Sequence, residues 1–97
     1  MIVAGDLVID RPTRRVHVRD TSVILSAKEF ELVAKLASEP YRVFTKEDLL
    51  REVWGYRALG RTRTLESHAS RVRKKLCVGP EDRFVVNVWG VGYRMLD

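Results

Sequence analysis

The sequence predicts an α+β domain with an N-terminal antiparallel sheet, three helices and a C-terminal β-hairpin. Short β-type runs fill residues 1–25, apolar residues recur at helical spacing in three segments between residues 26 and 76, and two further β-type runs flank a Gly-x-Gly turn. A chain of 97 residues has room for one hydrophobic core, so we expect a single domain spanning residues 1–97.

The β-type runs near the N-terminus are residues 7–9, 16–18 and 23–25, which are rich in valine and isoleucine. Turn-forming residues separate these runs at positions 10–13 and 20–22. Short runs joined by close turns predict neighbouring antiparallel strands, and therefore a small antiparallel sheet.

The first helix is predicted over residues 26–38. Ser26 and Glu29 have the spacing of a capping box, in which each side chain accepts a hydrogen bond from the backbone N–H of the other residue. The helix is expected to end before Pro40, because the residue preceding a proline avoids the helical region. The apolar residues of its buried stripe are Phe30, Val33, Ala34, Leu36 and Ala37.

The second helix is predicted over residues 45–54. Thr45 is a suitable N-cap, and Glu47 and Asp48 follow in the first turn, where the helix dipole favours negative charge. Gly55 suits the left-handed conformation that closes many helices. Residues 55–61 hold two glycines and no apolar stripe, so they are predicted to form a loop.

The third helix is predicted over residues 62–76 and has two different faces. Its apolar residues fall in one narrow sector and are Leu65, Ala69, Val72 and Leu76. The residues of the opposite face are Arg63, Ser67, Ser70, Arg71 and Lys74. Short serines beside long cations suit a helix that enters the major groove of DNA, since bulky neighbours would hold the arginines away from base edges.

Two polar residues flank this outer face. Glu66 is expected to pair with Arg63 or Arg73. His68 has two interpretations, contact with a phosphate or packing at the shoulder of the helix, and the sequence leaves both open.

The net charge of +5 is confined to one segment. Residues 57–75 hold seven cations and one anion, whereas the rest of the chain holds eleven cations and twelve anions. Concentrated positive charge is typical of a surface that binds a polyanion, because it attracts phosphates and releases their counterions. Charge alone leaves an ordinary solvated basic helix face as an equal alternative.

The C-terminal hairpin is predicted from β-type runs around residues 84–88 and 93–96, and a hairpin that follows a basic helix is typical of a wing. Trp89 and Tyr93 each have two interpretations. They either pack on the hairpin, which is the favoured interpretation for Tyr93, or press against sugar or base edges of DNA.

Composition excludes several other classes. A single cysteine, Cys77, cannot form an intrachain disulfide, and no apolar stretch approaches the roughly 18 residues of a membrane span, so we expect a cytoplasmic protein with no membrane contact. The two histidines, His17 and His68, are on separate elements and show no ligand spacing with the cysteine. We therefore expect no metal, no cofactor and no enzymatic activity.

Four sequence blocks together resemble the effector domains of OmpR/PhoB-family response regulators. In order along the chain they are Leu25-Ser26-Ala27-Lys28-Glu29-Phe30-Glu31-Leu32, Leu49-Leu50-Arg51-Glu52-Val53-Trp54-Gly55, Arg63-Thr64 with His68, Arg71, Arg73, Lys75 and Leu76, and Gly90-Val91-Gly92-Tyr93-Arg94. The resemblance covers nearly the whole chain, with the blocks at the family's separations.

This resemblance implies a winged helix-turn-helix with a four-stranded N-terminal sheet. It implies a transcriptional regulator of a two-component system, with residues 62–76 in the major groove, the wing of residues 84–96 at the minor groove, and a monomer in solution that binds DNA head to tail in tandem. The family's receiver domain is absent from these 97 residues. The resemblance also implies that the loop after the second helix touches RNA polymerase, through Tyr56, Arg57, Leu59 and Arg61.

The family's contact positions carry over residue by residue. Arg63, Thr64, His68 and Arg73 match phosphate contacts, Arg71 matches a base-reading arginine, and Trp54 and Tyr93 match aromatics beside the DNA backbone. The chain departs from the family at Trp89, where a cation is common, and at Ser67 and Ser70, where larger residues are common. The full set of predicted DNA contacts is Trp54, Arg63, Thr64, Ser67, His68, Ser70, Arg71, Arg73, Lys74, Trp89 and Tyr93. A winged-helix module that binds a protein partner is the alternative function, because a fold does not dictate its partner.

Overall fold

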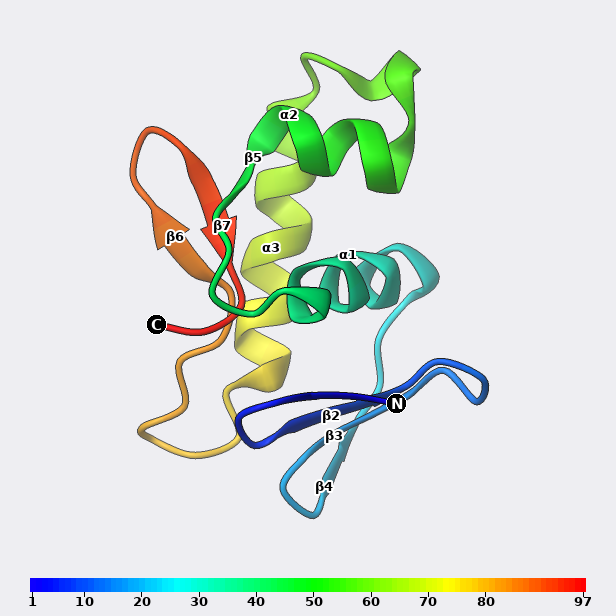
Figure 1. Cartoon of the computed structure of the whole chain (residues 1–97), viewed down its shortest axis with the longest axis vertical. Coiled ribbons are helices and arrows are strands. Elements are labelled where there is room, and N and C mark those ends of the chain that lie inside the picture. Colours follow the sequence, from blue (N-terminus) through cyan, green and yellow to red (C-terminus); the bar gives the residue numbers. More distant parts are fainter.

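The computed structural model describes residues 1–97 and has the predicted architecture (Figure 1). The N-terminal sheet has four antiparallel strands in sequence order: β1 (Ile2–Ala4), β2 (Leu7–Asp10), β3 (Arg15–Val18) and β4 (Thr21–Val23). The strand β1 could not be predicted from its own sequence, because three residues are too few to show the alternation of apolar and polar side chains. The last strand lies at 21–23 rather than the expected 23–25, since its register places Val23 opposite Val16.

Helix α1 (Ala27–Ser38) begins as predicted. Ser26 is its N-cap, and both hydrogen bonds of the capping box with Glu29 are present. Its apolar stripe is buried, and the helix packs against β1, against residues 50–54 and against the long helix α3 (Thr62–Leu76). Both helices therefore follow local sequence signals closely.

The second helix has the predicted extent but not a uniform geometry. It consists of α2 (Lys46–Leu49), capped by Thr45, and a wider turn η1 (Leu50–Trp54). Gly55 closes the helix with a positive φ of +99°, as predicted, but its ψ of 169° lies outside the left-handed helical region, in a conformation that glycine tolerates best. A short 3₁₀ helix, η2 (Tyr56–Ala58), fills part of the predicted loop.

The C-terminal hairpin is shorter than expected and belongs to a second sheet. Strands β6 (Val86–Val88) and β7 (Gly92–Arg94) form the wing, and β5 (Phe44–Thr45) pairs with β7 in the order β5-β7-β6. Phe84 and Met95 lie in the predicted runs but outside these strands, and both side chains are buried in the core, while the backbone N–H of Val85 still donates to the Met95 carbonyl oxygen.

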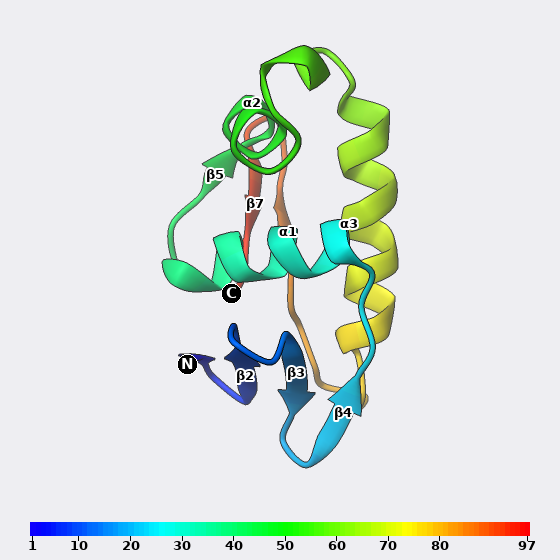
Figure 2. The ribbon, with the colours of Figure 1, turned by 90° about the vertical axis from the view of Figure 1, so that its right-hand side faces the viewer.

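The arrangement in space sets up one continuous surface. Figure 1 shows α2 at one end of the molecule, the four-stranded sheet at the other, and α3 running between them with the wing beside it. Figure 2 shows α3 along one edge, with α1 and α2 on its inner side. The outer side of α3 is therefore left open to solvent.

Candidate nucleic-acid interface

The outer face of α3 is exposed and basic, as the periodicity predicted. Leu65, Ala69, Val72 and Leu76 are at most 1% exposed, so the inner face is fully committed to the core. The residues exposed on the outer face are Arg63, Ser67, Ser70, Arg71 and Lys74. The outer face of the helix therefore presents three long cations and two short hydroxyls to solvent.

The start of α3 packs against the end of the second helix through an aromatic pair. The ring of Trp54 meets the ring of His68 edge to face, with centroids 5.0 Å apart and an interplanar angle of 76°. His68 Nδ1 lies 2.8 Å from the Thr64 carbonyl oxygen, so only Nε2 remains for another partner. Both rings are half-buried, so His68 packs at the shoulder of the helix. Its Nε2 has no hydrogen-bond partner within the chain.

Two polar side chains of α3 have partners that the sequence did not predict. Glu66 approaches Lys46, with its carboxylate 3.9 Å from Nζ, so the expected pairing with Arg63 or Arg73 was wrong. Arg73 instead donates from Nε to the Val85 carbonyl oxygen at 3.0 Å. Arg73 therefore joins α3 to the base of the wing.

A buried carboxylate lies beneath the C-terminal half of α3. Glu29 is only 2% exposed, yet its side chain receives Lys75 Nζ at 2.7 Å and lies 3.4 Å from Arg71 Nε. Burial raises the pKa of Glu29, but hydrogen bonds from Lys75 and Ser26 outweigh it and lower this pKa to about 2. The sequence pattern showed Glu29 only as a capping residue, because its two cations lie more than 40 positions away.

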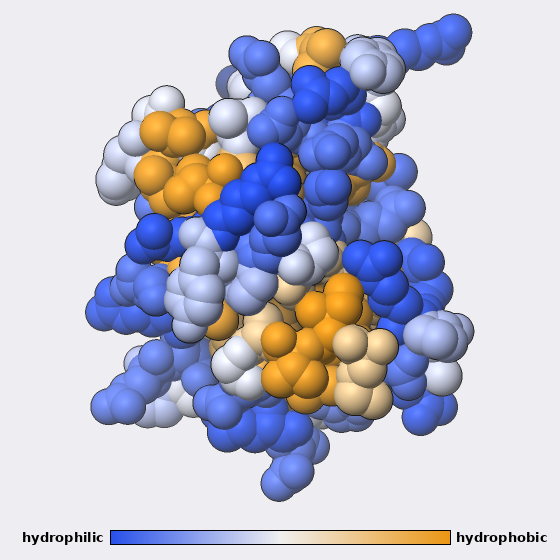
Figure 3. All heavy atoms as spheres, viewed as in Figure 1, coloured by the Kyte–Doolittle hydropathy of each residue, from blue (hydrophilic) through white to orange (hydrophobic).

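The aromatic residues of the wing lie in opposite environments. Trp89 is 88% exposed, so the interpretation that it folds back onto the hairpin was wrong. Tyr93 is 4% exposed and pairs with Phe44 in the β5-β7 ladder, and burial raises the pKa of its phenol. Tyr93 therefore packs in the hairpin, as favoured, and Trp89 is free to meet a partner. Figure 3 shows apolar side chains gathered over the wing, where Val91 is also exposed.

The loop between the second and third helices presents a mixed surface. Tyr56 and Leu59 are exposed apolar side chains, and Arg57 and Arg61 are exposed cations beside them. The four residues predicted to touch RNA polymerase thus lie on the surface at the end of the molecule that holds α2.

An ion cluster closes the far end of α3. Arg19 donates to Asp82 from both terminal nitrogens, at 2.9 and 2.7 Å, and approaches Asp6 at 3.2 Å. Asp82 also accepts the backbone N–H groups of Val78 and Gly79. The hydrogen bond from Arg19 is the main cause that lowers the pKa of Asp82 to about 2. This cluster fixes the loop after α3 against the N-terminal sheet.

Acid is expected to destabilise the domain through these two carboxylates. Their pKa values are about 2 in the folded chain and about 4 in an unfolded one, so their contribution is present above about pH 5 and is lost as pH falls toward 2. Unfolding in this window should take up as many as about two protons. Urea unfolding across pH 2 to 7 measures this, with Glu29→Gln and Asp82→Asn each expected to flatten the profile. An unchanged profile in both variants would contradict it.

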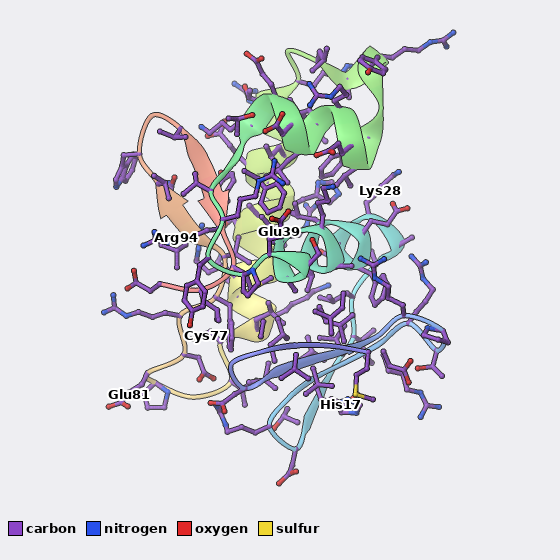
Figure 4. The ribbon with its side chains drawn as sticks, in the orientation of Figure 1. His17, Lys28, Glu39, Cys77, Glu81 and Arg94 are labelled. Atoms are coloured by element: carbon purple, nitrogen blue, oxygen red, sulfur yellow. The ribbon has the colours of Figure 1, made fainter.

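The remaining reactive side chains are dispersed. Figure 4 labels His17 on the N-terminal sheet and Cys77 just beyond α3, on separate elements. No group of three or more His, Cys, Asp or Glu side chains is arranged to hold a metal ion. None of the helices is both long enough and apolar enough to cross a membrane.

A three-helix core, a basic outer helix and an adjoining hairpin define the class of winged helix-turn-helix domains. Residues 20–95 match the family described as transcriptional regulatory protein, C terminal, and the chain belongs to this family of OmpR/PhoB-type effector domains. It is 44% identical over 96 residues to the transcriptional regulatory protein ResD of Bacillus subtilis, covering 97% of this chain and 40% of ResD.

Solved structures of DNA-binding domains have the same fold. The DNA-binding domain of the response regulator AdeR, in complex with an intercistronic region, superposes with a TM-score of 0.87 and 30% identity, covering 100% of this chain and 99% of that one. The Klebsiella pneumoniae RstA DNA-binding domain, in complex with the RstA box, superposes with a TM-score of 0.84 and 28% identity, covering 98% of this chain and 96% of that one.

Proposed function

We propose that this chain binds double-stranded DNA sequence-specifically, as the effector domain of a two-component transcriptional regulator. Helix α3 enters the major groove and the wing lies at the adjacent minor groove. The observation that carries the proposal is the two-sided character of α3: one face is entirely buried, and the other presents Arg63, Arg71 and Lys74 around two serines. Solved relatives of the same fold in complex with DNA support it.

The affinity for duplex DNA is expected to fall steeply with salt. If five to seven phosphates are neutralised by the basic segment of residues 57–75, log K should fall against log salt with a slope on the order of −5 to −6. Fluorescence anisotropy of a labelled duplex at several salt concentrations measures the slope. A slope near zero would refute the electrostatic argument and favour the alternative, a winged-helix module that binds a protein.

The predicted contacts have separate tasks in this proposal. Arg63, Thr64, His68 and Arg73 would position the domain on phosphates together with Trp54 and Lys74, and phosphate contacts carry no sequence information of their own. Arg71 would read a base edge, most simply guanine. Ser67 and Ser70 would allow the close approach that this contact needs.

Trp89 is expected to contribute contact area rather than charge. Trp89→Ala should weaken DNA binding by roughly 1–3 kcal/mol, the range for aromatic stacking on bases, and leave the salt slope unchanged, since an indole carries no charge. Because Trp89 is 88% exposed, the melting temperature should also stay unchanged. Unchanged affinity in this variant would rule out a direct contact between Trp89 and DNA.

The assembly of the domain on DNA belongs to the same proposal. The chain spans about 40% of the length of ResD. The domain would be monomeric alone, bind direct repeats in tandem in the cytoplasm, and meet RNA polymerase through Tyr56, Arg57, Leu59 and Arg61. Selection of bound sites from random duplex DNA tests the tandem arrangement, which requires repeated half-sites about one helical turn apart.

A further inference from the structure

Arg71, the residue proposed to read a base, is not a free side chain. Its Nε lies 3.4 Å from Glu29 Oε2, while Lys75, one helical turn further along α3, donates to Glu29 Oε1 at 2.7 Å. The backbone N–H of Ser26 donates to the same Oε1 at 2.8 Å. One buried carboxylate on α1 therefore holds two cations of the recognition helix.

The geometry leaves the reading end of Arg71 available. The contact to Glu29 is made through Nε, at the inner end of the guanidinium, and the Arg71 side chain is 54% exposed. Its two terminal nitrogens are the pair that can approach guanine in a bidentate way. A guanidinium held at Nε has fewer conformations to lose when it binds a base, so less binding energy is spent on ordering it.

The same contacts reduce non-specific attraction. Glu29 carries a full negative charge directly beneath Arg71 and Lys75, and its burial limits screening by solvent. Two cations that are partly offset by a fixed anion neutralise DNA phosphates less effectively. The carboxylate thus weakens the affinity for any duplex while it strengthens the affinity for the specific site.

We propose that Glu29 is a positioning residue for specificity, which orients Arg71 toward a base edge and offsets the charge of Arg71 and Lys75 against the DNA backbone. The proposal rests on the proposed function, because it assumes that α3 meets DNA. It assigns a part in sequence discrimination to a residue on α1 that contacts no nucleic acid itself.

The test compares the unmodified chain with Glu29→Gln on two duplexes. The first duplex is the tightest site selected from random duplex DNA by the unmodified chain, and the second has the same composition in scrambled order. Glutamine still supports a capping box, so the start of α1 is retained while the charge is removed. We expect the ratio of specific to scrambled affinity to fall about tenfold or more. The salt slope on the scrambled duplex should steepen by about one to two units.

A matched control separates positioning from stability. Ser26→Ala removes the hydroxyl that accepts from the Glu29 N–H but keeps the Ser26 backbone donor and both ion pairs, so it should lower the melting temperature without changing the affinity ratio. In an Arg71→Ala background, Glu29→Gln should have a much smaller effect on the ratio, because the side chain that Glu29 positions is gone and only the charge of Lys75 is left to offset.

The measurements distinguish a failure of the proposed function from a failure of the positioning proposal. If the unmodified chain does not prefer its selected duplex, the proposed function fails. If the unmodified chain prefers its selected duplex, three results with fully folded Glu29→Gln would overturn the positioning proposal. The affinity ratio stays unchanged, both affinities fall in parallel, or the ratio falls equally in the Arg71→Ala background. Melting temperatures of all variants establish the folded fraction.

Discussion

Replacing Gly92 by alanine is expected to lower the free energy of unfolding by roughly 3 kcal/mol or more. Gly92 lies on β7 opposite Thr45 of β5, and a Cβ at Gly92 would lie 2.9 Å from the Phe44 carbonyl carbon and closer still to its oxygen. The obstacle is backbone, which cannot rotate away as a side chain does. The β5-β7 pairing must therefore separate, and with it the attachment of the wing to the core. Urea unfolding measures the effect.

Gly90 in the same Gly-x-Gly turn provides the matched control. It has φ +75°, where a side chain is strained, but nothing lies within 4 Å of a Cβ placed there. Gly90→Ala should therefore cost only about 1–2 kcal/mol, the penalty for a left-handed alanine. A Gly90→Ala variant less stable than Gly92→Ala would show that turn conformation, rather than the close approach of two strands, is the reason for the motif.

The parts of the fold that depend on neighbouring residues could be predicted from the sequence. The capping box at Ser26 and Glu29 uses groups three positions apart, and the apolar stripe of α3 repeats every turn. Both signals lie within one element, so helix positions and the basic face followed from them. The short strands β1 and β5 could not be assigned from their own two or three residues, because they form only by pairing with β2 and β7.

The parts of the candidate site that depend on distant residues could not be predicted. Glu29 and Lys75 are 46 positions apart, and Arg73 finds the carbonyl of Val85 across the loop after α3. Glu66 had two plausible cations on its own helix but faces Lys46, because α2 packs against that side of α3. Pairing between charges follows the packing of helices, and spacing along one helix does not contain that information.

Replacing Leu65 by alanine is expected to lower the free energy of unfolding by about 2–5 kcal/mol. Leu65 is 0% exposed and lies on the inner side of the first turns of α3, the turns that also carry Arg63 and Thr64. Truncation removes apolar contacts and leaves a cavity that a close-packed core fills only in part. Urea unfolding measures the loss, and Ser67→Ala, on the exposed side of the same helix, should change stability by no more than about 0.5 kcal/mol.

The DNA affinity of Leu65→Ala distinguishes a supporting residue from a contact. Leu65 has no exposed surface, so the folded variant should keep both the affinity and the salt slope of the unmodified chain. Apparent affinity should fall only in proportion to the folded fraction, and it should recover under conditions that restore folding. Titrations of a labelled duplex over a range of temperatures, beside circular dichroism of the same samples, give both quantities. Weaker binding by a fully folded variant would mean that packing at Leu65 sets the position of the α3 contacts, and that the inner and outer faces of the helix are coupled.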